Sequence, residues 1–152
     1  MLKRNAWKFL LVPTVIVILF GISDVARGTD ADPAIVEGLT GLTVDEIAAA
    51  SPEAADVIDA LTRAQGMLLV WFGIALTAVV WFAYRDWQRW AWWTLWVLLL
   101  WALGVSIFFL LQDRPEGAAI PPPMVSGFVF FAYGAFWLAV SYRGFATGSH
   151  PD

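Results

Sequence analysis

Residues 67–84 and 90–111 form two apolar runs that contain no Asp, Glu, Lys, Arg or His. Each run is long enough to cross the hydrocarbon core of a bilayer, which takes about 20 residues of α-helix. Only Arg85, Asp86, Trp87, Gln88 and Arg89 separate them. A connection this short makes the two helices antiparallel neighbours, so the chain is predicted to be an integral membrane protein.

Two further apolar segments, at 9–23 and 124–142, flank this pair. The chain is 60% hydrophobic and only 14% charged, whereas soluble domains carry about 25% charged residues. Basic residues ahead of the first segment also resemble a signal peptide, but the acid of Asp24-Val25-Ala26 is unfavourable for cleavage. We therefore predict an all-α, integral membrane four-helix bundle in a single domain, 1–152, with helices at about 9–23, 64–84, 90–111 and 124–142.

The segment 24–63 is the one sizeable polar stretch and is predicted to be a partly helical, acidic outer loop. Thr43 and Glu46 have capping-box spacing, which predicts a helix from Val44. Ser51 followed by Pro52 predicts a second helix start that continues into the next membrane helix. Residues 28–41 and the tail 143–152 are rich in Gly and Pro, and we expect an irregular loop and a disordered tail, respectively.

Charge is divided unevenly between the two ends of the predicted bundle. With the N-terminus inside, the inner side holds six of the nine basic residues, and the outer side holds eleven of the thirteen acidic ones. The positive-inside rule then predicts that both termini are cytoplasmic in a multi-pass protein of the cell inner membrane.

The first candidate site lies at the inner hairpin, where basic and aromatic residues alternate. Guanidinium groups stacked on indoles hold anionic lipid headgroups or the acids of a partner. The same residues also serve as an aromatic belt with positive anchors, the more common use. The candidates are Arg85, Arg89, Trp90, Trp92 and Trp93.

A second candidate set consists of small residues on helix faces. Such residues let helix backbones approach closely in lipid, either within one chain or between two chains. Packing within the chain is the simpler interpretation, because the strict GxxxG spacing is missing. The set comprises Gly66, Gly73, Gly127, Gly134 and Ser141.

A third candidate set lies on the outer part of the second helix and comprises Glu53, Asp56, Asp59 and Arg63. Carboxylates at a bilayer surface bind Ca²⁺ or act as acid–base groups, although most such clusters are solvated acidic faces. The i,i+4 spacing of Asp59 and Arg63 favours an ion pair.

Several chemistries are disfavoured by what the chain lacks. The chain has no Cys and a single His, His150, so no thiolate or histidine metal site and no cofactor is expected. The second, third and fourth apolar segments carry none of the charged residues that mark proton or ion pathways. Membrane lipids, and another membrane protein or a second copy, are the expected partners, and no nucleic acid is expected.

Part of the chain resembles a group of small four-helix bacterial membrane proteins to which no function has been assigned. The likeness covers about residues 42–100 and depends on Arg63-x-x-Gly66, Tyr84-Arg85 and Arg89-Trp90-Ala91-Trp92-Trp93. It implies a bacterial inner-membrane setting, and it supplies no function for this chain. This chain does not fit four-helix families whose function depends on cysteine pairs, because it has no Cys. It also does not fit exporters that need a membrane-embedded Glu, because its apolar segments contain none.

Three functions remain open from the sequence. The first is a non-catalytic accessory or scaffold subunit of a membrane complex, which fits the small size and the uncharged membrane segments. The second is a binding or carrier protein for a lipid or apolar small molecule, with a pocket lined by Trp96, Trp101, Phe130 and Phe131. The third is an outer-surface enzyme that uses Glu53, Asp56 or Asp59.

Overall fold

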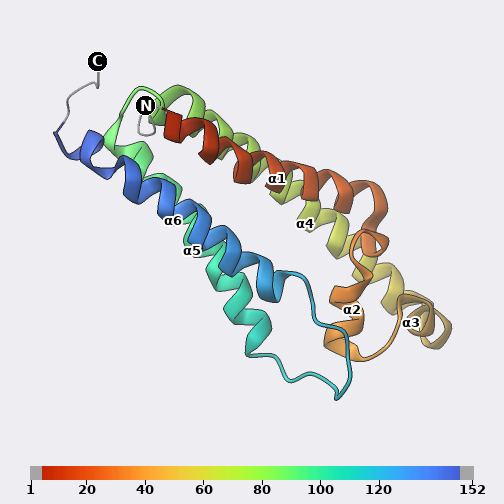
Figure 1. Cartoon of the computed structure of the whole chain (residues 1–152). Coiled ribbons are helices and arrows are strands. Elements are labelled where there is room, and N and C mark those ends of the chain that lie inside the picture. Colours follow the sequence, from red (N-terminus) through yellow and green to blue (C-terminus); the bar gives the residue numbers. More distant parts are fainter. Residues whose placement is uncertain (1–4, 148–152) are drawn as a thin grey trace.

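The structure is a computed structural model that describes residues 5–147, apart from the side chains of residues 143, 146 and 147. The described residues are mostly helical and contain no strand. Figure 1 shows the elements in order. They are α1 (Ala6–Arg27), η2 (Gly28–Ala31), α2 (Pro33–Thr40), α3 (Val44–Ala50), α4 (Pro52–Ala78), η3 (Val79–Tyr84), α5 (Arg89–Leu110) and α6 (Pro123–Thr147).

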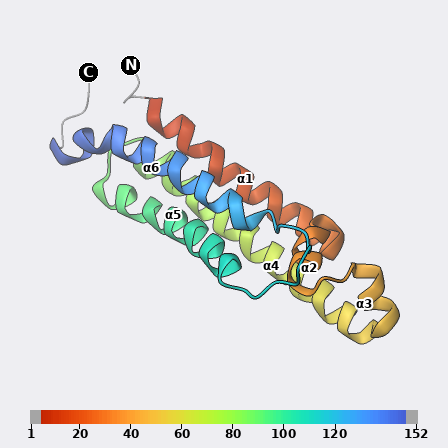
Figure 2. The ribbon, with the colours of Figure 1, turned by 60° about the horizontal axis from the view of Figure 1, so that its bottom comes forward.

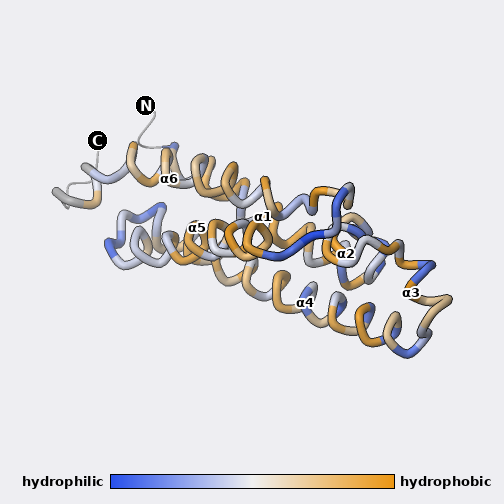
Figure 3. The backbone as a smooth tube through the Cα atoms, turned by 90° about the horizontal axis from the view of Figure 1, so that it is seen from below, coloured by the Kyte–Doolittle hydropathy of each residue, from blue (hydrophilic) through white to orange (hydrophobic). Residues whose placement is uncertain are grey.

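Four helical segments are long and apolar enough to cross a membrane, as the sequence predicts. They are Ala6–Ala31, Pro52–Tyr84, Arg89–Leu110 and Pro123–Tyr142. Figure 3 shows hydrophobic residues along these helices, and hydrophilic residues concentrated in the hairpin and connecting segments. The second segment is the longest, with 33 residues, because α4 begins at Pro52 and continues through η3. The predicted continuity from Ser51 into the membrane helix is confirmed.

The four helices associate as two pairs, and the first consists of α1 and α4. Glycine lets these helices touch: a Cβ on Gly66 would lie 2.8 Å from the carbonyl oxygen of Gly21, and one on Gly73 would lie 2.6 Å from Ile18. Thr77 donates a hydrogen bond across the pair to Thr14, at 3.0 Å. The pair is therefore held by close backbone approach rather than by large interlocking side chains.

The second pair consists of α5 and α6, again with small residues at the contact. A Cβ on Gly127 would lie 2.1 Å from the Ala102 carbonyl oxygen, and one on Gly134 would lie 2.2 Å from Leu99. The indole N–H of Trp92 donates to the Leu138 carbonyl at 3.0 Å, and Ser106 donates to the Pro123 carbonyl at 2.6 Å.

The two pairs meet near the ends at Ala6 and Thr147 and diverge toward the opposite end (Figure 1). Phe9 of α1 stacks on Trp137 of α6, with ring centroids 4.0 Å apart. Phe72 of α4 contacts Trp101 of α5 at 5.6 Å. The hairpin Arg85–Gln88 then joins η3 to α5 at the converging end.

At the diverging end, η2, α2 and α3 form a helical cap (Figures 1 and 2). The expected irregular loop at 28–41 is wrong: Pro33 starts α2, and Gly41, with φ +73°, ends it in the left-handed region. Proline at the first position and glycine just after the end are typical helix boundaries, and in this segment they start and stop a helix. The predicted capping box is present, with Thr43 Oγ1 accepting from the Glu46 N–H at 3.2 Å.

The cap also contacts the connection between α5 and α6. A Cβ on Gly38 of α2 would lie 2.5 Å from the Ala119 carbonyl oxygen and 2.6 Å from Pro121, which is fully buried. The run Pro121-Pro122-Pro123, which leads into α6, thus places the start of the α5–α6 pair against the cap of the α1–α4 pair. The cap therefore bridges the pairs at the end where they diverge.

The prediction of disorder from residue 143 is wrong up to Thr147, where α6 ends. The hairpin packs on this extension: the guanidinium of Arg89 donates to the Phe145 carbonyl at 2.9 Å, and Trp87 lies 4.8 Å from the Phe145 ring. Tertiary contact therefore extends a helix that its local Gly content disfavours. Residues 148–152 lie outside the described part of the chain.

Candidate functional site

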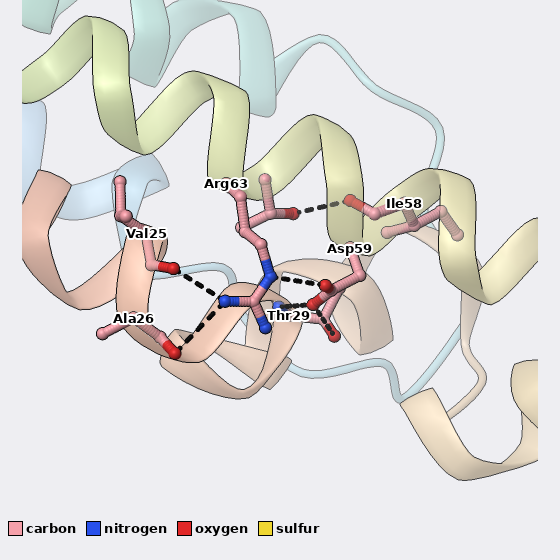
Figure 4. Close-up of polar contacts among 7 residues, drawn as sticks. Val25, Ala26, Thr29, Ile58, Asp59 and Arg63 are labelled. Atoms are coloured by element: carbon pink, nitrogen blue, oxygen red, sulfur yellow. Dashed lines mark hydrogen bonds and ion pairs between the residues drawn. The ribbon is translucent and has the colours of Figure 1, made fainter.

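The most connected polar cluster joins α4 to the end of α1, and we name Asp59, Arg63, Thr29 and the carbonyls of Val25 and Ala26 the clasp (Figure 4). Ser51 caps α4 through the Ala54 N–H at 3.3 Å, so the helix begins well before its apolar part. Asp59 and Arg63 then lie one turn apart on the face of α4 that meets α1.

Arg63 is the central donor of the clasp. Its Nε donates to Asp59 Oδ2 at 2.6 Å, and its Nη1 donates to the carbonyl oxygens of Val25 at 2.7 Å and Ala26 at 3.2 Å. These carbonyls belong to the last turn of α1, where the helix dipole leaves partial negative charge. The guanidinium therefore caps α1 and ties it to α4.

Asp59 connects the same arginine to η2. Its Oδ1 accepts from the backbone N–H of Thr29 at 3.0 Å and from the Thr29 hydroxyl at 3.4 Å. The chain turns beside it at Gly28, which is buried and has φ +59°. A Cβ there would lie 1.7 Å from Asp59 Oδ1, so only glycine fits against the carboxylate.

The predicted outer-surface residues are therefore not assembled into one site. Asp59 and Arg63 form the expected ion pair, while Glu53 and Asp56 are exposed and make no bond to the clasp. Within residues 5–147, no group of three or more His, Cys, Asp and Glu side chains is placed to hold a metal ion. The hydrogen bonds of the clasp go to the protein's own backbone and side chains.

A small hollow lies beside the clasp, under the cap. Its volume is about 10 Å³, and it is lined by Thr29, Val36, Val44, Ile47, Ala55 and Ile58. A space this size holds at most one water molecule. The hollow is therefore a small gap in the packing between the cap and α4, and it is too small for a substrate.

The predicted hairpin site is split between the interior and the surface. Trp92 is 8% exposed and packs within the α5–α6 pair, and Arg89 caps the end of α6. Arg85 lies over the Trp81 ring at 5.7 Å and pairs with Asp86 at 3.5 Å. Trp90 and Trp93 are 53% and 67% exposed, so these two, with Arg85, are the residues that a headgroup or partner would reach.

Three of the four aromatics expected to line a pocket, Trp96, Trp101 and Phe131, contact other aromatic rings. Trp96 lies 6.3 Å from Phe131, and Trp101 meets Phe72 of α4. The indole N–H of Trp96 is buried and has no hydrogen-bond acceptor among the described residues. An unsatisfied buried donor costs about 1–3 kcal/mol, and among the described residues this is the one fully buried side-chain nitrogen or oxygen without a partner.

A buried polar contact at the converging end was not predicted. The backbone of η3 is π-helical, with the Arg85 N–H bonded to the Val80 carbonyl at 3.1 Å. This turn directs Tyr84 inward, where its hydroxyl donates to Ser141 Oγ at 2.5 Å and Ser141 donates to the Leu138 carbonyl at 2.8 Å. The sequence signal that could have predicted this contact is the presence of a tyrosine and a serine in otherwise apolar helices.

These features define an all-helical protein with four helices long enough to span a membrane and a helical cap at one end. Comparison with protein-family models, curated proteins and solved structures finds no match.

Proposed function

We propose that this protein is a non-catalytic accessory or scaffold subunit of a membrane complex. One observation carries the proposal: the best-connected polar cluster, the clasp, fastens the cap to the helices. Its arginine and carboxylate are bonded to α1 and η2, so they hold the cap in position and neither is free for acid–base work.

In this proposal the cap faces the outer side of a bacterial inner membrane and both termini are cytoplasmic. The distribution of charge supports this orientation, because most acidic residues belong to the cap end and most basic residues to the hairpin end. Exposed Trp90, Trp93 and Lys8 then lie at the inner interface as anchors. The cap presents an acidic surface, which suits a basic patch on the partner.

The proposal is tested by affinity purification of the full chain from native membranes in mild detergent. The variant Glu53→Lys/Asp56→Lys reverses two exposed charges at the start of α4, next to the cap, that make no contact with the clasp. We expect it to lose a partner protein that the wild type retains, while Asp86→Lys, at the hairpin, keeps it. Equal recovery of the same proteins by all three chains, or recovery of none, contradicts the proposal.

A second candidate function, binding of an apolar molecule that carries a carbonyl, is favoured by the unpaired Trp96 N–H alone. Phe in place of Trp96 removes the N–H donor and keeps an aromatic, though smaller, side chain. We expect mass spectrometry to find a bound molecule of a few hundred daltons on the wild type and none on Trp96→Phe. A bare chain in both cases rejects this function.

A further inference from the structure

One face of α4 has no partner along its whole length. Apolar residues recur there at alternating three- and four-residue steps, the spacing of a coiled-coil seam. We name this row the α4 seam: Ala54, Val57, Leu61, Ala64, Leu68, Trp71 and Ala75. Every member is exposed, including Val57 at 58%, Leu61 at 66% and Leu68 at 72%.

The seam lies opposite the face that α4 uses for α1. Asp59, Gly66 and Gly73 follow one another at seven-residue steps and all meet α1 or the turn after it. In the same helical register, seam positions fall on the far side of the helix. The seam is therefore free of the pairing that holds α1 and α4 together.

The first half of the seam lies outside the hydrocarbon of a membrane. Asp24 and Arg27 are the first charged residues after the apolar part of α1, and Asp24 lies beside Gly66 of α4. Leu61 and Val57 are five and nine residues further out, about 7 and 13 Å along the helix. Since the headgroup layer adds only about 5–7 Å on each side, lipid does not cover Val57.

The outer face of α1 provides the comparison. Val12, Val15, Leu19 and Ile22 have the same spacing and are also exposed, but the large apolar residues of this row end before Asp24, and only Ala26 follows. Lipid is a sufficient partner for a row that stops at the charged boundary. It is not sufficient for the α4 seam, which continues for about three more turns into water.

A helix that covers the seam must also pass from water into the membrane beside α4. All copies of one chain insert in the same orientation, so two copies of α4 run parallel, and a two-fold axis matches each seam with itself. The positions flanking the seam carry a single charged residue, Glu53; the others are Ile58, Ala60, Gln65, Met67, Phe72 and Ile74. Asp56, Asp59 and Arg63 fall on other positions, so like charges do not meet across the pair.

From these observations we propose that a second copy of this chain docks on the α4 seam, forming a parallel two-helix contact that crosses the membrane boundary. The outer half buries Val57 and Leu61, and the small residues Ala54, Ala64 and Ala75 allow close approach. This pairing concerns a second copy of the chain, whereas the proposed scaffold function concerns a different protein that binds the acidic end of the molecule.

Single cysteines test the pairing, because the chain contains none. In the full chain in liposomes, we expect oxidative cross-linking of Val57→Cys and Leu61→Cys to the size of two copies. The controls Asp56→Cys and Thr62→Cys, off the seam, should cross-link at least tenfold less. Uniform cross-linking along 54–64, no cross-linking at seam positions, or seam adducts with a different protein in native membranes would each overturn the proposal.

A charge on the seam gives an independent readout. Leu61→Glu should raise the dissociation constant of the pair at least tenfold in liposomes, measured by energy transfer between labelled copies. The matched control is Ile120→Glu, since Ile120 is 63% exposed and lies on the α5–α6 connection. Circular dichroism of both variants checks that the helices remain folded. Equal dissociation constants for the two variants, or a wild type that stays monomeric, reject the seam.

Discussion

Arg63→Ala removes the donor that fastens the cap to the membrane helices. The variant loses two bonds to the last-turn carbonyls of α1 and the ion pair with Asp59, while the bond from Thr29 to Asp59 remains. We therefore expect local loosening of η2 and α2 rather than loss of the whole fold.

The magnitude follows from the exposure of the clasp. The Arg63 and Asp59 side chains are 43% and 33% exposed, so solvent screens their ion pair and it contributes little to the sum. Each carbonyl bond adds about 0.5–1.5 kcal/mol, because the freed carbonyls can be rehydrated. The sum, about 2 kcal/mol, corresponds to roughly thirtyfold faster opening of the cap.

Hydrogen exchange with mass spectrometry, on protein in lipid nanodiscs, measures this opening. We expect amides of 29–40 to exchange roughly thirtyfold faster in Arg63→Ala, with α5 unchanged. Arg63→Lys should recover little, because an ammonium group lacks the fork that reaches a carboxylate and two carbonyls. Arg114→Ala, a change on the α5–α6 connection, is the control. Equal exchange in Arg63→Ala and Arg114→Ala would refute the role of the clasp.

Three further predictions concern other contacts. Gly66→Ala places a Cβ 2.7 Å from Asp24 and should lower the stability of the α1–α4 pair by about 2 kcal/mol in thermal unfolding. The control Gly104→Ala has open space around it and should be neutral or stabilising. Equal melting temperatures of the two variants would count against the close packing of α1 on α4. Tyr84→Phe removes one buried bond and should cost about 1 kcal/mol in the same assay, and an unchanged midpoint would be inconsistent with that bond. Hydrogen bonds from Thr43 lower the pKa of the Glu46 carboxyl in the folded protein. The stabilisation of α3 by this carboxylate is therefore complete above the unfolded-state pKa, and it is lost as the pH falls through the lower folded-state pKa. Hydrogen exchange of α3 amides should show this pH dependence in the wild type and lose it in Glu46→Gln.

Local signals in the sequence predict most helix starts correctly. Thr43, Ser51 and Pro52 begin helices because capping depends on a few adjacent residues. The prediction of an irregular loop at 28–41 is wrong because Gly and Pro occur at helix boundaries as well as in loops. In fact Pro33 and Gly41 bound a helix, and Gly38 is small so that α2 can meet Pro121, which is distant in sequence.

The candidate sites were harder to predict, because they depend on which helices pair. The i,i+4 spacing identified Asp59 and Arg63, but their bonds to Thr29, Val25 and Ala26 span more than 25 residues of chain. In the run 90–101, apolar residues occupy every face, so periodicity could not assign Trp92 to the interior and Trp93 to the surface. Burial in that run is decided by the close approach of α6 at Gly134 and Gly127.

Native mass spectrometry of the protein, extracted with its surrounding lipid from native membranes, tests the scaffold proposal most directly. The account predicts an assembly that contains the 16.8 kDa chain together with a different protein. Assemblies of two identical chains alone would support the α4 seam and contradict the scaffold role. A bare single chain would contradict both.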